Sequence, residues 1–243
     1  MKPLLPAFAR ILALPSPAAL CRLDADLVSA MASARAWGKT TAAGLVYALA
    51  GSAVFGAAFG CWRAPLQALY SALKMPVLIL AVTGFSAVIN TLLAQALGAA
   101  LSFRQVLGCM LTGFAITSIL LAAVAPCTLF FAWQAPPPDS SAALLSYRVL
   151  LPLNTAVVGV CGILANLRLF RLLATLTGSS RLAARVLIAW ILASGLAGCE
   201  LSWVLSPFLA RPDLPIPFFN PNAFTGNFFE YLFKAAFGVL EGQ

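Results

Sequence analysis

The sequence predicts an all-α fold: a polytopic transmembrane helical bundle of about five spans, with an amphipathic interfacial helix at each end. Hydrophobic residues fill 62% of the 243 positions and charged residues only 9%, whereas soluble domains have about 45–50% and about 25%. The apolar residues also come in runs of roughly 20, the helix length that crosses the hydrocarbon of a bilayer. The spans are expected at residues 41–60, 77–98, 106–133, 149–167 and 186–206.

These spans divide the chain into three regions. Residues 1–40 form a basic N-terminal region, residues 41–206 the transmembrane domain, and residues 207–243 a proline-rich extension with a C-terminal helix. Prolines break the first apolar stretch, so it lacks the uninterrupted apolar core of a cleavable signal peptide.

The N-terminal region carries the pattern of an amphipathic helix between Pro17 and Trp37. Its apolar residues share one helical face: Leu20, Leu23, Leu27, Ala30 and Met31. A helix of this kind lies in the membrane interface with that face toward the lipid. The alternative is a basic tail that only orients the chain.

The first span carries a stripe of small residues. Gly44, Ala48, Ser52, Gly56 and Gly60 recur at every fourth position and therefore share one helical face. In lipid, such a face lets the backbone of another helix approach closely. We expect a helix-packing interface here, although small residues are also frequent in transmembrane helices in general.

Polar and proline residues mark the second and third spans. Pro65 and Pro76 suit the starts of helices, so residues 62–75 are expected to form a short connection, with a brief interfacial helix as one form that it can take. Asn90 lies near the middle of the second span, where its amide needs a hydrogen-bond partner on another helix. A substrate contact is the alternative for Asn90. Pro126 is expected to kink the third span.

Glu200 is the only carboxylate within the expected spans, and it lies about 9 Å inside the interface. A charge at that depth costs about 2.5 kcal/mol or more unless it is paired or protonated. We expect an ion pair with Arg148 at the start of the fourth span, which would lock helices together. The alternative is a proton- or cation-binding site, with Asn90 and Asn154 as the other polar groups.

The extension after the fifth span is expected to be extended first and helical later. Its prolines keep the first part out of a helix, whereas aromatic residues at three- and four-residue spacings predict a helix near Asn222 to Leu240. Because Glu230 and Lys234 lie in its middle, we expect this helix to lie in the interface and not to form a sixth span.

Basic residues favour a cytoplasmic N-terminus and a C-terminus on the opposite side of a cell membrane, such as a bacterial inner membrane. With that topology, ten basic residues are cytoplasmic and five are not. The two sets are Lys2, Arg10, Arg22, Arg35, Lys39, Arg104, Arg168, Arg171, Arg181 and Arg185, against Arg63, Lys74, Arg148, Arg211 and Lys234.

The residues that most enzyme chemistry needs are missing from this sequence. It contains no histidine, the usual metal ligand and proton carrier near neutral pH, and no GxSxG or HExxH motif. The six cysteines form no CxxC pair and are interpreted as small hydrophobes. We expect no catalytic, cofactor or metal site. The scattered basic residues also argue against nucleic-acid binding.

Three stretches carry a further pattern: Ala72 to Gly108, Glu200 to Phe208, and Pro217 to Phe233. They resemble the Yip family of five-span membrane proteins, in particular its bacterial members of unknown function, over residues 45–235. Eukaryotic members are partners of Rab GTPases, which bacteria lack, so the resemblance implies a fold and little activity. The family more often has glutamine at the position of Glu200 and arginine at that of Ser206.

We therefore expect a noncatalytic integral membrane protein that acts through helix–helix association. It would be an accessory or scaffold subunit of a membrane complex, or a Yip-like membrane-organising protein. Its expected partners are membrane lipids and other membrane protein subunits or further copies of the chain. The alternative is a small transporter or channel that uses Glu200, Asn90 and Asn154.

Overall fold

A computed structural model describes residues 14–32 and 37–230 of the chain, and no strand occurs among them. Five of its helices are long and apolar enough to cross a membrane, so the predicted all-α fold with five spans is confirmed. The helices are α2 (Pro17–Arg22), α3 (Ala25–Ala32), α4 (Trp37–Gly60), α5 (Pro65–Ala96), α6 (Phe103–Gln134), α7 (Ala143–Thr177) and α8 (Ser180–Leu205).

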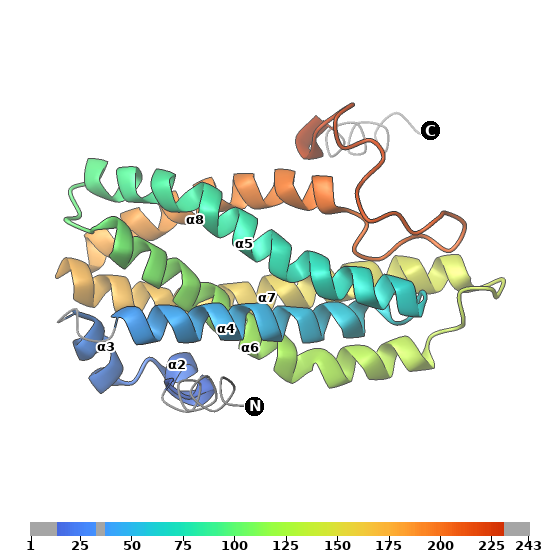
Figure 1. Ribbon diagram of the computed structural model, residues 1–243, viewed down its shortest axis with the longest axis horizontal. Coiled ribbons are helices and arrows are strands. Elements are labelled where there is room, and N and C mark those ends of the chain that lie inside the picture. Colours follow the sequence, from blue (N-terminus) through green and yellow to red (C-terminus); the bar gives the residue numbers. More distant parts are fainter. Residues whose placement is uncertain (1–13, 33–36, 231–243) are drawn as a thin grey trace, which may run out of the picture.

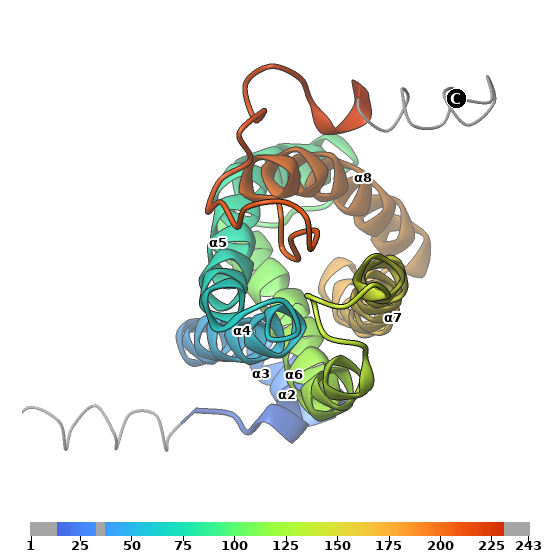
Figure 2. The same ribbon diagram turned by 90° about the vertical axis from the view of Figure 1, so that its right-hand side faces the viewer.

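The five long helices form a ring (Figures 1 and 2). α4 packs most extensively on α6 and next on α5, α6 packs on α7, and α8 closes the ring by contacting both α5 and α7. Helices α5 and α7 face each other across the ring and share almost no contact. The α7–α8 turn lies at the end of the bundle where α4 begins, and the segment after α8 lies at the opposite end (Figure 1).

All five spans begin before their expected first residues, and the difference is largest in α5, where Pro76, expected at a helix start, lies inside the helix. Pro76 is within α5 and Pro152 is within α7. The expected connection over 62–75 is therefore wrong, since α5 already begins at Pro65. A proline removes one backbone hydrogen bond, but a span that stopped there would leave many more unpaired groups in lipid.

Helix α7 is also longer than a bilayer requires. Its 35 residues correspond to about 52 Å, against about 30 Å of hydrocarbon. Arg168 and Arg171, which follow the expected fourth span, thus belong to α7 itself, whereas Arg181 and Arg185 belong to α8.

The expected single helix over 17–37 is wrong. Helix α2 ends at Leu23, which has a left-handed backbone conformation (φ 50°), and α3 follows as a separate helix. The apolar face does not lie against lipid as a whole, because Leu20, Leu23 and Met31 are buried in the protein. Both short helices pack against the end of the bundle where α4 begins. Residues 33–36 lie outside the described part.

Apolar packing is concentrated at the two ends of the ring. One cluster includes Trp37 and Leu172 and receives the side chains of α3. The other cluster includes Phe55 and Trp62 at the opposite end, and Leu209 from the C-terminal extension packs into it. These two clusters bound the middle of the bundle, where a cavity remains.

The C-terminal helix begins later than the sequence indicated. Residues 221–225 form turns, and helical geometry starts at Phe228. Asn227 caps this start, because its side-chain oxygen accepts a hydrogen bond from the Glu230 backbone nitrogen at 2.7 Å. The rest of the expected helix, including Lys234, lies outside the described residues.

Candidate functional site

The middle of the ring holds a half-open cavity of about 470 Å³, to which all five long helices contribute lining residues. Most of these side chains are apolar, and none of the described residues that line the cavity carries a charge. Several small polar groups interrupt the apolar lining, among them Asn90, Asn166, Ser118 and Ser194. The cavity is thus an uncharged chamber with a few hydrogen-bonding groups.

Asn90 is the polar centre of this cavity, and its side chain is completely buried. Its Nδ2 donates to Ser194 Oγ on α8 at 2.9 Å and lies 3.5 Å from the sulfur of Met110 on α6. The indole nitrogen of Trp190 donates to the backbone oxygen of Asn90 at 2.8 Å. Asn90 thus joins α5 to α6 and α8, while its Oδ1 has no hydrogen-bond partner among the described residues.

Asn154 joins the other side of the ring. The hydroxyl of Thr128 on α6 donates to Asn154 Oδ1 at 3.0 Å, and Asn154 Nδ2 donates to the Leu150 backbone oxygen at 2.8 Å. Both ends of this amide are therefore satisfied. Asn154 does not line the central cavity, so its contact serves helix packing alone.

The expected ion pair between Glu200 and Arg148 is wrong. Arg148 is exposed near the start of α7, and the salt bridge found among the described residues joins Arg211 to Asp213 in the extension. Glu200 Oε2 instead accepts a hydrogen bond from the Phe228 backbone nitrogen at 3.3 Å. A carboxylate at the first amide of a helix is favourable because the backbone dipoles there present positive charge. Glu200 thus fixes the C-terminal helix onto α8.

The small-residue stripe of α4 contacts two helices of the same chain. Gly44 lies against the backbone of Leu111 on α6, whereas Gly56 and Gly60 lie against the backbones of Ser71 and Gln67 on α5. A side chain at Gly56 or Gly60 would overlap those backbone atoms.

The other two members of the stripe, Ala48 and Ser52, are buried as well. Gly51, which the four-residue pattern omits, also lies in the interface with α6, where a Cβ would overlap the carbonyl of Ser118. The stripe is a packing interface, and it is occupied within the monomer.

Sequence reasoning missed a polar contact between α5 and the extension, which we call the carbonyl clamp. Its members are Arg63, Gln67, Ser71 and Lys74, which donate hydrogen bonds to backbone oxygens of residues 207–217. The spacing of four and three residues places Gln67, Ser71 and Lys74 on one side of α5, and Arg63 lies in the turn just before that helix.

Lys74 is the innermost member of the carbonyl clamp and is completely buried. Its Nζ donates to the backbone oxygens of Pro207 at 2.8 Å and Pro217 at 3.2 Å. The same ammonium lies 5.3 Å from the ring centroid of Phe218 and 5.9 Å from that of Tyr70. Carbonyl dipoles and aromatic faces together replace the water that this cation would otherwise need.

The outer members of the clamp hold the rest of the segment. Gln67 Nε2 donates to the Phe208 backbone oxygen at 2.9 Å, and the Ser71 hydroxyl donates to the same oxygen at 2.5 Å. Arg63 donates to the backbone oxygens of Arg211, Pro212 and Leu214, of which the Pro212 contact is the shortest at 2.9 Å. At the exposed edge, the hydrogen bond from Arg211 lowers the pKa of the Asp213 carboxyl below its usual value.

The clamp has a simple physical reason. A proline-rich segment cannot form a helix or a sheet, so its backbone oxygens must find donors elsewhere. One feature of the sequence could have predicted this contact: residues 63–74, next to an apolar span, contain several hydrogen-bond donors and no carboxylate that could pair with them.

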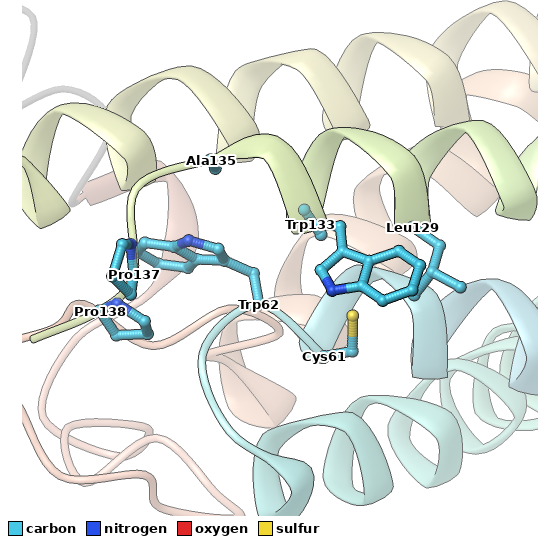
Figure 3. Close-up of a pocket in the computed structure, with 8 residues that line it drawn as sticks. Cys61, Trp62, Leu129, Trp133, Ala135, Pro137 and Pro138 are labelled. Atoms are coloured by element: carbon cyan, nitrogen blue, oxygen red, sulfur yellow. The ribbon is translucent and has the colours of Figure 1, made fainter.

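A second, smaller pocket lies on the surface at the same end of the bundle (Figure 3). Its volume is about 390 Å³, and Trp62, Trp133 and two prolines of the α6–α7 loop contribute to its lining. Trp62 Nε1 donates to the Pro136 backbone oxygen at 3.0 Å, and the Cys61 sulfur points toward the indole of Trp133. Because Trp133 is 88% exposed, this pocket resembles the indole belt that membrane proteins place at the interface.

Comparison with known proteins gives no relative. No family model matches the chain, and no curated protein or solved structure is similar to it. The resemblance to the Yip family therefore stays a prediction, and the function is argued from the cavity and its polar groups.

Proposed function

We propose that this protein is a noncatalytic membrane protein that binds an apolar molecule from the bilayer in the cavity between α4, α5, α6, α7 and α8. The observation that carries the proposal is the cavity itself, about 470 Å³ in volume with a mostly apolar, uncharged lining from all five helices. Sites for small molecules are typically concave, mostly apolar and about 300–1,000 Å³ in volume, with a few polar groups for orientation.

Transport of an ion by this cavity has little support. A site for an ion inside a membrane needs charged or several polar ligands that face one chamber. Of the three residues expected to serve transport, only Asn90 lines the cavity, whereas Glu200 and Asn154 do not. Glu200 is engaged with the backbone of Phe228.

The main argument for a scaffold function, an exposed stripe of small residues, does not hold either. The stripe from Gly44 to Gly60 was the expected surface for a partner, but it is covered by α5 and α6 of the same chain. Association with another membrane protein or a further copy of the chain stays a prediction, and it would have to use the lipid-facing sides of the ring.

Photolabelling in lipid vesicles tests the proposal. A long-chain alkyl diazirine is incorporated into the bilayer, and its adducts are mapped by peptide mass spectrometry. We expect adducts on buried cavity residues such as Met110 and Leu169, which are 5% and 6% exposed. Adducts confined to lipid-facing side chains would contradict the proposal.

A matched pair of variants gives the control. Gly113 lines the cavity and has room for a Cβ, with the nearest atom being the side chain of Leu169 at 3.4 Å. Gly113→Phe should fill the cavity and remove the adducts. Gly159 lies on an exposed part of α7 with no atom within 4 Å of its added Cβ, so Gly159→Phe should leave the adducts unchanged.

A further inference from the structure

The polar groups of the cavity are unevenly satisfied. Most of its donors already bond within the protein: Asn90 Nδ2 to Ser194, Asn166 Nδ2 to the Gly162 backbone oxygen, and Thr117 to the Gly113 backbone oxygen. The Ser118 hydroxyl is the exception, because it is buried and has no hydrogen-bond partner among the described residues. Trp190 Nε1 is likewise bonded, to the Asn90 backbone oxygen.

One acceptor in the cavity wall lacks a hydrogen-bond donor. Asn90 Oδ1 is fully buried and has no hydrogen-bond partner within the described chain. A buried amide oxygen without a donor is destabilising, so such a group in a cavity wall indicates a ligand that supplies one.

The shape of the cavity favours a chain-like ligand. Its lining on α8 runs from Leu187 to Ser202, which corresponds to about 22 Å of helix. Ser194, the partner of Asn90, lies in the middle of that length. From there toward the end closed by the extension, the walls are formed largely by apolar side chains such as Leu78, Leu121 and Val158.

From these observations we propose that the cavity binds an uncharged long-chain alcohol, whose hydroxyl group donates to Asn90 Oδ1 and whose alkyl chain extends toward Ser202. This inference rests on the proposed function and adds the chemical class of the ligand. A carboxylate or ammonium head group does not fit, because no lining residue offers it an opposite charge. An ether or ester would leave Asn90 Oδ1 unpaired, since it has no hydrogen to donate.

The test compares three diazirine probes that share one alkyl chain: dodecanol, its methyl ether and the dodecanoate anion. Each is incorporated separately into vesicles that contain the full-length protein, and adducts on Met110 and Leu169 are quantified against bulk partitioning. We expect the alcohol to label these residues about tenfold more than the ether, the scale of one hydrogen bond to a group that is otherwise unpaired. We also expect the dodecanoate to label them least.

Two variants assign the preference to Asn90. Asn90→Leu removes the acceptor and should make the alcohol and the ether label equally. Because Asn90 also joins helices, Ser194→Ala provides a milder change: it keeps the amide but frees Nδ2 to donate to a ligand oxygen. In this variant we expect the ether to gain labelling, so that the alcohol preference shrinks several-fold.

The outcomes separate the two proposals. Cavity adducts of equal yield from the alcohol and the ether would overturn the ligand class and leave the apolar-binding function standing. Strong cavity labelling by the dodecanoate would also overturn the ligand class. If neither these probes nor the plain alkyl diazirine labels the cavity, the binding function itself is wrong. An alcohol preference that persists in both variants would overturn the assignment to Asn90.

Discussion

Asn90 and Asn154 each connect α5 or α7 to neighbouring helices through one amide group, but they differ in whether every polar atom of that amide has a partner. In a bilayer no water competes for these groups, so a side-chain amide that finds a partner on another helix holds the two helices together. Asn154 has partners at both ends, as a purely structural residue should. Asn90 Oδ1 has no partner in the part of the chain that the structure describes, and this difference separates the packing contact from the candidate binding group.

The Asn154 contact can be measured by a double-mutant cycle. We expect Asn154→Leu to lower stability by about 1 kcal/mol, the usual scale of a hydrogen bond between transmembrane helices. Thr128→Val should cost less in the Asn154→Leu background than in the native protein, because the hydrogen bond that it removes is already gone. Equal costs in both backgrounds, measured by unfolding in mixed detergent micelles, would show that the contact is not energetically coupled.

Lys74 should matter more than any other member of the carbonyl clamp, because it is a completely buried cation. Lys74→Met removes the donor for the backbone oxygens of Pro207 and Pro217. We expect faster chymotryptic cleavage after Phe208 and a lower melting temperature. Leu73→Met, on the exposed neighbour, is the control and should change neither. Unchanged cleavage in Lys74→Met would contradict the assigned role.

At the scale of elements, α4 makes the closest helix contacts in the ring, with α6 and with α5. It accommodates α6 at Gly44 and Gly51, and its last turns accommodate α5 at Gly56 and Gly60. Close backbone approach takes the place of the hydrophobic effect, which cannot drive helices together in lipid. The same feature explains why the stripe continues along the whole span.

Gly51 gives the sharpest test of this packing. A side chain there would overlap the Ser118 carbonyl, whereas an added Cβ at Gly84 meets no atom within 4 Å. We expect Gly51→Leu to destabilise the protein by about 1–3 kcal/mol, as overpacking of a tight interface does. Gly84→Leu should be nearly neutral in the same thermal unfolding measurement. Equal effects of the two substitutions would show that α4 and α6 are not in close contact.

Features that depend on residues close together in the sequence could be predicted. Apolar runs located all five spans, and the four-residue spacing of small side chains located the packing face of α4. The start of α5 was misplaced because Pro76 is tolerated inside a helix that neighbours and lipid hold together. The face of α2 and α3 was correctly apolar, yet no local pattern distinguishes burial against the bundle from burial in lipid.

The contacts of the site depend on pairings between distant residues. The partners of the carbonyl clamp are more than 130 residues away in sequence, and backbone oxygens leave no mark in the choice of side chain. Glu200 was expected to pair with the side chain of Arg148, whereas its partner is the backbone amide of Phe228. Asn90 was recognised as a polar group in need of a partner, but the cavity beside it required the three-dimensional arrangement.

At the scale of the whole molecule, charge is distributed unequally between the two ends. Among the described residues, the end where α4 begins carries seven bases and two acids: Arg22, Lys39, Arg104, Arg168, Arg171, Arg181 and Arg185, with Asp24 and Asp26. The opposite end has four of each: Arg63, Lys74, Arg148 and Arg211, with Asp139, Glu200, Asp213 and Glu230. This asymmetry favours the first end as the cytoplasmic one.

Cysteine accessibility tests that orientation. In a variant without the six native cysteines, Ser180→Cys places a thiol at the start of α8 and Ser141→Cys places one in the α6–α7 loop. In intact cells we expect a membrane-impermeant maleimide to label the Ser141 variant, and the Ser180 variant only after the membrane is opened. The reverse pattern would invert the predicted topology.

The carbonyl clamp also sets an order in time. A ribosome delivers α5 to the membrane long before it has made residues 207–217, so Lys74 must wait with its ammonium unmatched until α8 has been inserted. The polypeptide made directly after α8 is thus the part that completes this end of the bundle. A nonsense mutation anywhere before Pro207 would remove the backbone oxygens that bind the Lys74 ammonium. We therefore expect the cell to degrade such a truncated chain as it degrades a misfolded protein.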